Sequence, residues 1–387
     1  MALIDFKVLP GIDKQDTASG AEFRWIDCDN TRFRYGLPEK VGGWSSLITD
    51  TIVGVARREF AFVDLDGNRY VAIGTDKFLL IYFEGQLYDI TPLKTTLTSA
   101  TLATTNTSAI CSITTGTNHD LSVGDIVLLD TVTLPVGTGY VDADFENKLF
   151  QVTSITSATV FTITQSTAAT ATVGTGGSLS VKPYEQVGPA EQSYGYGWGI
   201  DTWSSGKWGE AASASDVSLE PGLWSLSNFG QVLVATIANG KTFTWNAGDA
   251  ARLITRASTT TSGFETTNNP TATRVSLISP TTRHLIHLGT ETTIGDPTTQ
   301  DDMFIRFSDQ EDINDYVPTA INSAGSQRLQ DGTRIIGALK AKESILVWTD
   351  NALYTMKFIG APFTFGFEQV GTNCGLIGKN AAIEIDG

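Results

Sequence analysis

Histidine, the side chain best suited to general-base chemistry, occurs only three times in this sequence of 387 residues. His119 lies in a polar turn ahead of Leu-Ser-Val-Gly-Asp. His284 and His287 are three positions apart in an apolar segment typical of a strand, so their side chains point to opposite faces and cannot share a metal ion. A histidine base or ligand therefore has little support.

Acidic side chains offer a second kind of chemistry. One loop after Phe307-Ser308 carries a cluster of oxygen donors: Asp309, Glu311, Asp312, Asn314 and Asp315. Hard cations gather such oxygens, but the loop lacks the spacing and the glycine of the helix-flanked calcium loop. A solvated acidic turn is the favoured interpretation, with a calcium site as the alternative.

Other catalytic motifs are absent. The two catalytic carboxylates of a glycosidase are recognised by the distance between them, which a sequence does not give, so such a pair could lie anywhere in the fold. The Ser-x-Asp-x-Gly-x-x-Trp turn of sialidase propellers does not occur. The glycine-rich stretches 174–177 and 195–199 follow no strand–turn–helix pattern, and Cys28, Cys111 and Cys374 form no Cys-x-x-Cys pair. We therefore expect no cofactor, no metal and no enzymatic activity.

Charge and hydropathy limit the partners. Lys and Arg number 26 against 42 Asp and Glu, a net charge of −16 that should repel a nucleic acid backbone. The first residues lack the charged and apolar regions of a signal peptide, and no apolar run approaches the roughly 18 residues of a membrane helix. The sequence predicts a soluble chain made in a reducing cytoplasm.

The elements that would position these residues are strands. Short alternating segments separated by Asp/Asn/Gly turns predict an all-β fold. A recurring unit of a strand, a gap, an apolar strand, a tight turn and an aromatic strand predicts stacked blades of a β-propeller-like body. The instances span residues 69–90, 224–245, 274–307 and 335–356.

Residues 97–182 interrupt this pattern. They are dense in Thr, Ser, Ala and Val, without Lys or Arg between Lys94 and Lys148, yet they alternate like strands. We predict an inserted small β-sandwich or barrel domain. The expected plan is an extended docking arm (1–50), a first part of the propeller (51–96), the insertion (97–182) and further blades (183–387). Residues 381–387 alternate as well, and we expect a strand there that a partner or further chain would complete.

A glycine- and aromatic-rich loop spans residues 190–210. Glycines permit tight chain paths, and Trp and Tyr supply large contact areas at low entropic cost. The favoured interpretation is that these aromatic side chains fix the loop against the rest of the chain or against a neighbouring subunit. The alternative is that they form a surface on which sugars bind. The predicted interface residues of this loop are Tyr196, Trp198, Trp203 and Trp208.

Several stretches resemble one family. Residues 10–17 (PGIDKQDT), 24–27 (RWID) and 32–44 resemble the N-termini of the packaged-DNA stabilisation and tail-nozzle (tail tubular protein B-like) proteins of short-tailed phages. The 194–209 loop and the segments 307–316 and 349–354 fit the same resemblance. Residues 119–125 look like a module of phage structural proteins. The C-terminal end departs from the family, because the chain is short for it.

The resemblance implies a structural virion protein of the phage tail. It would form a homo-oligomeric ring of six copies below the portal-adaptor ring, contact other tail proteins, retain packaged double-stranded DNA and conduct it during ejection without sequence-specific binding. An acidic wall suits that passage, because it repels phosphate. Predicted interface residues of the arm are Arg24, Trp25, Arg32, Arg34 and Trp44. The alternative is a receptor-binding or glycan-degrading tail component.

Overall fold

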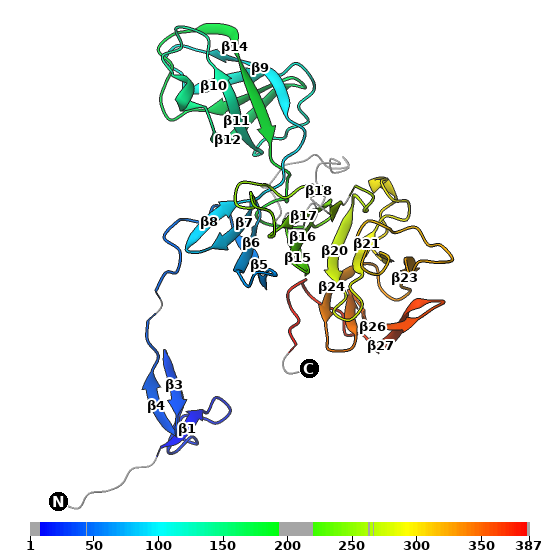
Figure 1. Cartoon of the computed structure of the whole chain (residues 1–387). Coiled ribbons are helices and arrows are strands. Elements are labelled where there is room, and N and C mark those ends of the chain that lie inside the picture. Colours follow the sequence, from blue (N-terminus) through cyan, green and yellow to red (C-terminus); the bar gives the residue numbers. More distant parts are fainter. Residues whose placement is uncertain (1–7, 44, 193–219, 262–263, 266, 385–387) are drawn as a thin grey trace, which may run out of the picture. The chain divides into compact units, whose positions relative to one another are not determined.

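The computed structural model describes residues 8–43, 45–192, 220–261, 264–265 and 267–384. The predicted all-β class is confirmed: every regular element of the described residues is a strand, apart from two 3-10 turns, η1 (Asp142–Asp144) and η2 (Pro297–Thr299). Residues 1–50 form one compact unit and residues 51–387 a second (Figure 1).

The N-terminal unit consists of two small strand pairs. Strand β1 (Leu9–Ile12) pairs in parallel with β2 (Arg24–Trp25), and β3 (Thr31–Arg34) forms a hairpin with β4 (Leu37–Lys40). Tyr35 and Gly36 have φ angles of 51° and 81°, the left-handed conformations that a two-residue hairpin turn requires. Among the described residues of this unit, Ala21 is the only buried hydrophobic one.

Four antiparallel sheets form the body of the second unit. The first comprises β5 (Ala56–Val63), β6 (Arg69–Thr75), β7 (Leu79–Phe83) and β8 (Gln86–Asp89), and the second β15 (Trp224–Phe229), β16 (Val232–Ile237) and β17 (Thr242–Asn246). The third comprises β20 (Thr273–Ile278), β21 (Leu285–Thr290), β22 (Phe304–Phe307) and β23 (Gly325–Arg328), and the fourth β24 (Ile335–Lys340), β25 (Ile345–Thr349), β26 (Ala352–Gly360) and β27 (Thr364–Thr372). A short pair, β18 (Thr260–Thr261) and β19 (Phe264–Glu265), follows the second sheet.

The four sheets stack in chain order through their first strands. Strand β5 contacts β15, β15 contacts β20, and β20 contacts β24. Successive sheets share buried apolar clusters: the first with the second, the second with the third, and the third with the fourth. Because each sheet buries its faces against its neighbours, the arrangement is blade-like.

One close approach ties the first two blades together. Trp224 of β15 is buried, and its Nε1 donates a hydrogen bond of 3.0 Å to the carbonyl oxygen of Thr75. A Cβ atom at Gly74 would lie 2.7 Å from the Trp224 ring. Glycine at this position of β6 is therefore what allows the indole to pack so closely against the neighbouring strand.

Residues 97–183 form a closed six-stranded barrel. Its strands are β9 (Leu97–Thr104), β10 (Ile110–Thr114), β11 (Ile126–Thr133), β12 (Lys148–Ser157), β13 (Val160–Thr164) and β14 (Val173–Pro183), in the spatial order β10-β13-β12-β11-β14-β9. Alternate residues point inward, and they form an apolar cluster separate from the blades, with Leu129, Phe145 and Phe161 fully buried. The closed sheet has no free edge strand.

The expected strand over residues 381–387 is wrong for its described part, because residues 381–384 have no strand conformation. Side chains just before them are bound to the first strands of two blades. Lys379 Nζ donates to Ser225 Oγ at 2.7 Å, and Asn380 Oδ1 accepts from Arg58 Nη1 at 3.1 Å. The segment therefore crosses the blades rather than extending a sheet.

Candidate functional site

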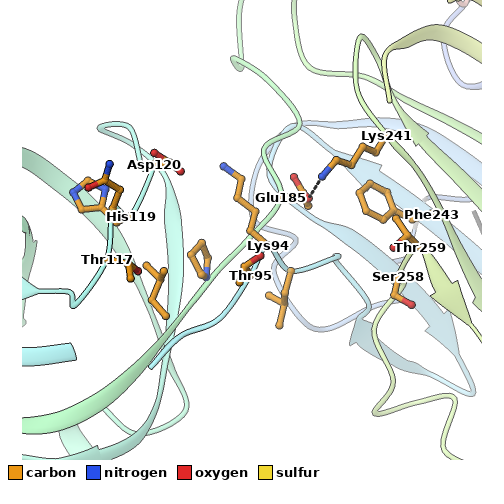
Figure 2. A pocket seen from close by; sticks show the side chains of 14 residues that line it. Lys94, Thr95, Thr117, His119, Asp120, Glu185, Lys241, Phe243, Ser258 and Thr259 are labelled. Carbon is orange, nitrogen blue, oxygen red and sulfur yellow. Dashed lines mark ion pairs between the residues drawn. The ribbon is translucent and has the colours of Figure 1, made fainter. Parts of the chain in front are cut away.

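A cleft with a volume of about 580 Å³ lies within the second unit. Figure 2 shows its three sources: the barrel loop with Thr117, His119 and Asp120, the chain segments that enter and leave the barrel, and the second blade. The second blade contributes Phe243 and Lys241 to the lining. Charged side chains of both signs line the cleft.

Backbone hydrogen bonds fix the two segments that join the barrel to the blades. The amide of Lys94 donates to the Pro183 carbonyl at 2.8 Å, and the amide of Glu185 donates to the Pro92 carbonyl at 2.9 Å. Leu93 and Tyr184 form an antiparallel bridge between them. This short ladder positions Lys94 and Glu185 in the lining of the cleft.

A half-buried polar network of Asp89, Tyr184 and Arg256 joins the same segments to the blades. Tyr184 donates its hydroxyl to Asp89 Oδ2 at 2.6 Å, and Arg256 donates to Asp89 Oδ2 at 3.0 Å and to the Tyr184 hydroxyl at 2.6 Å. The Arg256 guanidinium also lies over the Tyr184 ring, 4.7 Å from its centroid. Burial, reinforced by the Asp89 carboxylate, raises the pKa of Tyr184, so the phenol stays protonated and holds the junction.

His119 reaches the cleft but has both ring nitrogens engaged. Its Nδ1 accepts from the Leu121 amide at 3.0 Å, and its Nε2 lies 3.0 Å from the Ser157 carbonyl oxygen, to which it donates. Its ring packs edge-on against Phe161. These contacts hold the imidazole in the barrel wall, which agrees with the polar turn residue that the sequence predicted.

The cleft also contains charged groups of both signs. Glu185 forms an ion pair with Lys241 at 3.7 Å, and Asp120 lies on the barrel side in Figure 2. Phe243, an aromatic residue of the lining, is only 3% exposed and so offers a sugar ring little surface for stacking. Glu185 and Lys241 carried no sequence signal, because they belong to no motif and only the fold brings them together.

The predicted interface residues of the arm are engaged within their own unit. Arg24 pairs with Asp13 at 3.1 Å and Arg32 with Glu39 at 3.0 Å, while Arg34 lies over the ring of Tyr35. Trp25 contacts Phe33 with ring centroids 6.4 Å apart. Trp44, Tyr196, Trp198, Trp203 and Trp208 lie outside the described residues.

The other two histidines are buried in the third blade. His287 Nε2 lies 2.9 Å from the Tyr316 hydroxyl, and burial together with Arg306 lowers the pKa of His287 to about 3. His284 binds Thr282 through Nδ1 at 2.7 Å and Ser323 through Nε2 at 2.9 Å, and burial lowers its pKa. Both are neutral residues of the packed interior.

The acidic loop is bound by its own backbone and neighbours. Asp309 Oδ1 accepts from the Ser323 amide at 2.7 Å and from the Ser323 hydroxyl at 2.6 Å. Burial opposes ionisation of Asp309, but these hydrogen bonds outweigh it and lower its pKa. Asp315 accepts from the Val317 amide and from Asn322, and Glu311 pairs with Arg283 at 3.4 Å.

In the part of the chain that the structure describes, no three His, Cys, Asp or Glu side chains are grouped to hold a metal ion. Nor does any helix there have the length and apolarity to cross a membrane.

Comparisons with known proteins give little guidance. No protein-family model and no curated protein matches this sequence. Among solved structures, the chain is similar to a phage phi92 endosialidase, with 13% identity and a TM-score of 0.25, over 80% of this chain and 48% of that one. The chain thus spans about half the length of that protein. A TM-score of this size does not establish a shared fold.

Proposed function

We propose that this chain is a structural protein of a short-tailed phage tail, which forms a nozzle ring below the portal-adaptor and passes DNA during ejection. The resemblance of residues 10–17, 24–27 and 32–44 to nozzle proteins supports this reading. The observation that supports it most strongly is the exposure of apolar side chains in the N-terminal unit, in which those residues lie.

That unit has almost no core of its own. Eight of its large apolar side chains are each at least 40% exposed: Leu9, Ile12, Phe23, Ile26, Tyr35, Leu37, Val41 and Leu47. Two hairpin-sized strand pairs without a packed face are marginal in water. Exposed apolar surface of this kind marks a protein-binding site. A docking arm that packs on the ring above accounts for it.

The basic residues of the arm contribute less than its apolar ones. Because Arg24 and Arg32 already pair with Asp13 and Glu39, they are partly neutralised before any partner arrives. We therefore assign the arm's affinity chiefly to its apolar residues, with charge setting orientation.

Immunogold electron microscopy of virions from the source culture, with antibody against this chain, tests the proposal. Gold at the neck or the short tail is the expected result. Gold on peripheral fibres or spikes would transfer the chain to receptor binding, and its absence from particles would end the virion reading.

The cleft at the barrel junction favours a second candidate, a tail component that binds or degrades glycans. Its volume and its mixed polar lining, with Asp120 and Glu185 as the carboxylates, suit a short polar ligand. A glycosidase needs two carboxyl groups at a defined separation across the bond. Release of reducing sugar from host envelope glycans, lost in Glu185→Gln and retained in Glu146→Gln on the barrel, would favour this candidate. The expectation that the chain is not an enzyme stays a prediction.

A further inference from the structure

A second cavity, of about 190 Å³, lies where the first strands of all four blades meet. Strand β5 contributes Arg58, β15 contributes Ser225 and Ser227, and β24 contributes Lys340. Lys379 comes from the segment that crosses the blades after β27, and β20 supplies apolar wall. Residues separated by more than 300 positions thus converge on one small space.

The charged residues that line this cavity are all cationic. Arg58, Lys340 and Lys379 line it together with no Asp or Glu. None of the three forms an ion pair with a carboxylate of the described residues. In a protein with a net charge of −16, three half-buried cations with no ion pair among the described residues are an unusual concentration of positive charge.

The polar groups of the cavity are also mostly hydrogen-bond donors. Lys379 Nζ donates to Ser225 Oγ at 2.7 Å, and that oxygen also accepts from the Ser276 amide at 3.2 Å. Lys340 Nζ donates to Ser227 Oγ at 2.9 Å, and that oxygen accepts from the Ile278 amide at 3.4 Å. Each hydroxyl already accepts two hydrogen bonds, so only its proton remains to be given.

Arg58 adds a further donor. Its Nη1 donates to Asn380 Oδ1 at 3.1 Å, while its Nε is buried and has no hydrogen-bond partner among the residues that the structure describes. A buried donor without an acceptor costs about 1–3 kcal/mol, and more for a charged group. The cavity therefore lacks one component, a group that carries negative charge and several acceptor oxygens.

We propose that this cavity binds a doubly charged tetrahedral oxyanion, a phosphate or sulfate group, held by Arg58, Lys340 and Lys379. Its volume suits a single such group rather than a larger organic ligand. Three cations and two hydroxyl protons match the charge and the acceptor oxygens of a dianion better than those of a monocarboxylate. The site is independent of the tail function proposed above.

The two lysines of the site are expected to make anion binding depend on pH. Burial, and then Arg58, lowers the pKa of Lys340 to about 8. Burial, and then Arg58 and Arg274, lowers the pKa of Lys379 to about 7, while Glu220 opposes that change. An anion favours the protonated lysines, so binding takes up protons, and affinity falls as the pH rises through 7 and then 8.

Isothermal titration of the full chain with sulfate is the test, because sulfate remains a dianion over this pH range. We expect one site per chain, an affinity that decreases from pH 6 to pH 9, and proton uptake on binding. Lys379→Gln and Lys340→Gln should each weaken binding about tenfold to a hundredfold. Lys342→Gln, an exposed lysine just beyond β24, is the matched control and should bind as the parent does.

Thermal unfolding supplies a second readout. Sulfate should raise the Tm of the parent and of Lys342→Gln more than that of Lys379→Gln, and the difference measures specific binding over general salt effects. Without sulfate, Lys379→Gln should not lower the Tm, because it removes repulsion. Equal effects of sulfate on all three proteins, or equal loss of binding in the control, would overturn the proposal.

The same titration identifies the source of the anion. Inorganic phosphate and glycerol phosphate present the same group, free or as an ester. Binding of both assigns the site to a phosphate carried on a larger molecule, and binding of the inorganic ion alone assigns it to a free ion.

Discussion

The N-terminal unit and the inserted barrel are both small β structures, but they differ in how their apolar side chains are covered. The barrel closes six strands around an apolar cluster that includes Leu129, Phe145 and Phe161, and so it buries its inward face and has no edges. The N-terminal unit has two separate strand pairs and a single buried hydrophobic residue, Ala21. One region is self-sufficient, whereas the other presents apolar side chains to its surroundings.

This difference teaches how to tell a packed module from an assembly segment in one chain. Both regions alternate polar and apolar residues, but alternation stabilises a fold only where a second layer covers the apolar face. In the barrel the sheet covers itself. The described residues of the arm supply no such layer, which is why we propose the docking function there.

The largest difference between the barrel and the N-terminal unit is expected when a leucine is replaced by alanine in each of them. Leu129→Ala removes a fully buried side chain of β11 and should lower the free energy of unfolding by about 2–5 kcal/mol, through lost burial and a cavity. Leu37→Ala removes a side chain of β4 that is 70% exposed and should change it by about 0.5 kcal/mol or less. Urea unfolding of both variants measures the contrast, and equal losses would show that the arm has a core.

The barrel junction should give a smaller effect. Arg256→Gln removes the guanidinium that donates to Asp89 and Tyr184, and it leaves Asp89 without its cation. We expect a loss of about 1–3 kcal/mol, because hydrogen bonds to charged groups are among the stronger ones. Protease cleavage should become faster in the segments beside Lys94 and Glu185, while the barrel itself stays resistant. Arg283→Gln, in a half-exposed ion pair with Glu311, serves as the control.

The smallest effect on stability is expected for substitutions in the N-terminal arm, and these substitutions test its docking role. Leu37→Ser with Leu9→Ser should leave the Tm of the isolated chain unchanged within error, since both side chains are exposed. The same substitutions should remove incorporation into particles if the arm packs on a ring above. Normal incorporation would contradict the docking role, and the double variant Asp66→Ser with Glu343→Ser controls for loss of surface residues.

The sequence by itself determined the all-β class and the positions of most strands. Alternation and Asp/Asn/Gly turns located most of the blade strands, because side-chain period and turn chemistry are local properties. It also assigned His119, His284 and His287 to structural positions, since three scattered histidines without a motif offer no base. For the acidic loop it favoured a solvated turn, whereas the structure shows Asp309 hydrogen-bonded to Ser323.

Only the tertiary structure decided which distant residues meet. Nothing in the sequence links Arg58 to Lys340 and Lys379, or Asp89 to Arg256, because each pair is separated by more than 160 positions and shares no motif. The path of the chain after β27 was mispredicted for the same reason: local alternation favours a strand, but Lys379 and Asn380 are held by Ser225 and Arg58 of other blades. Long-range contacts depend on how sheets stack, and local pattern does not specify that stacking.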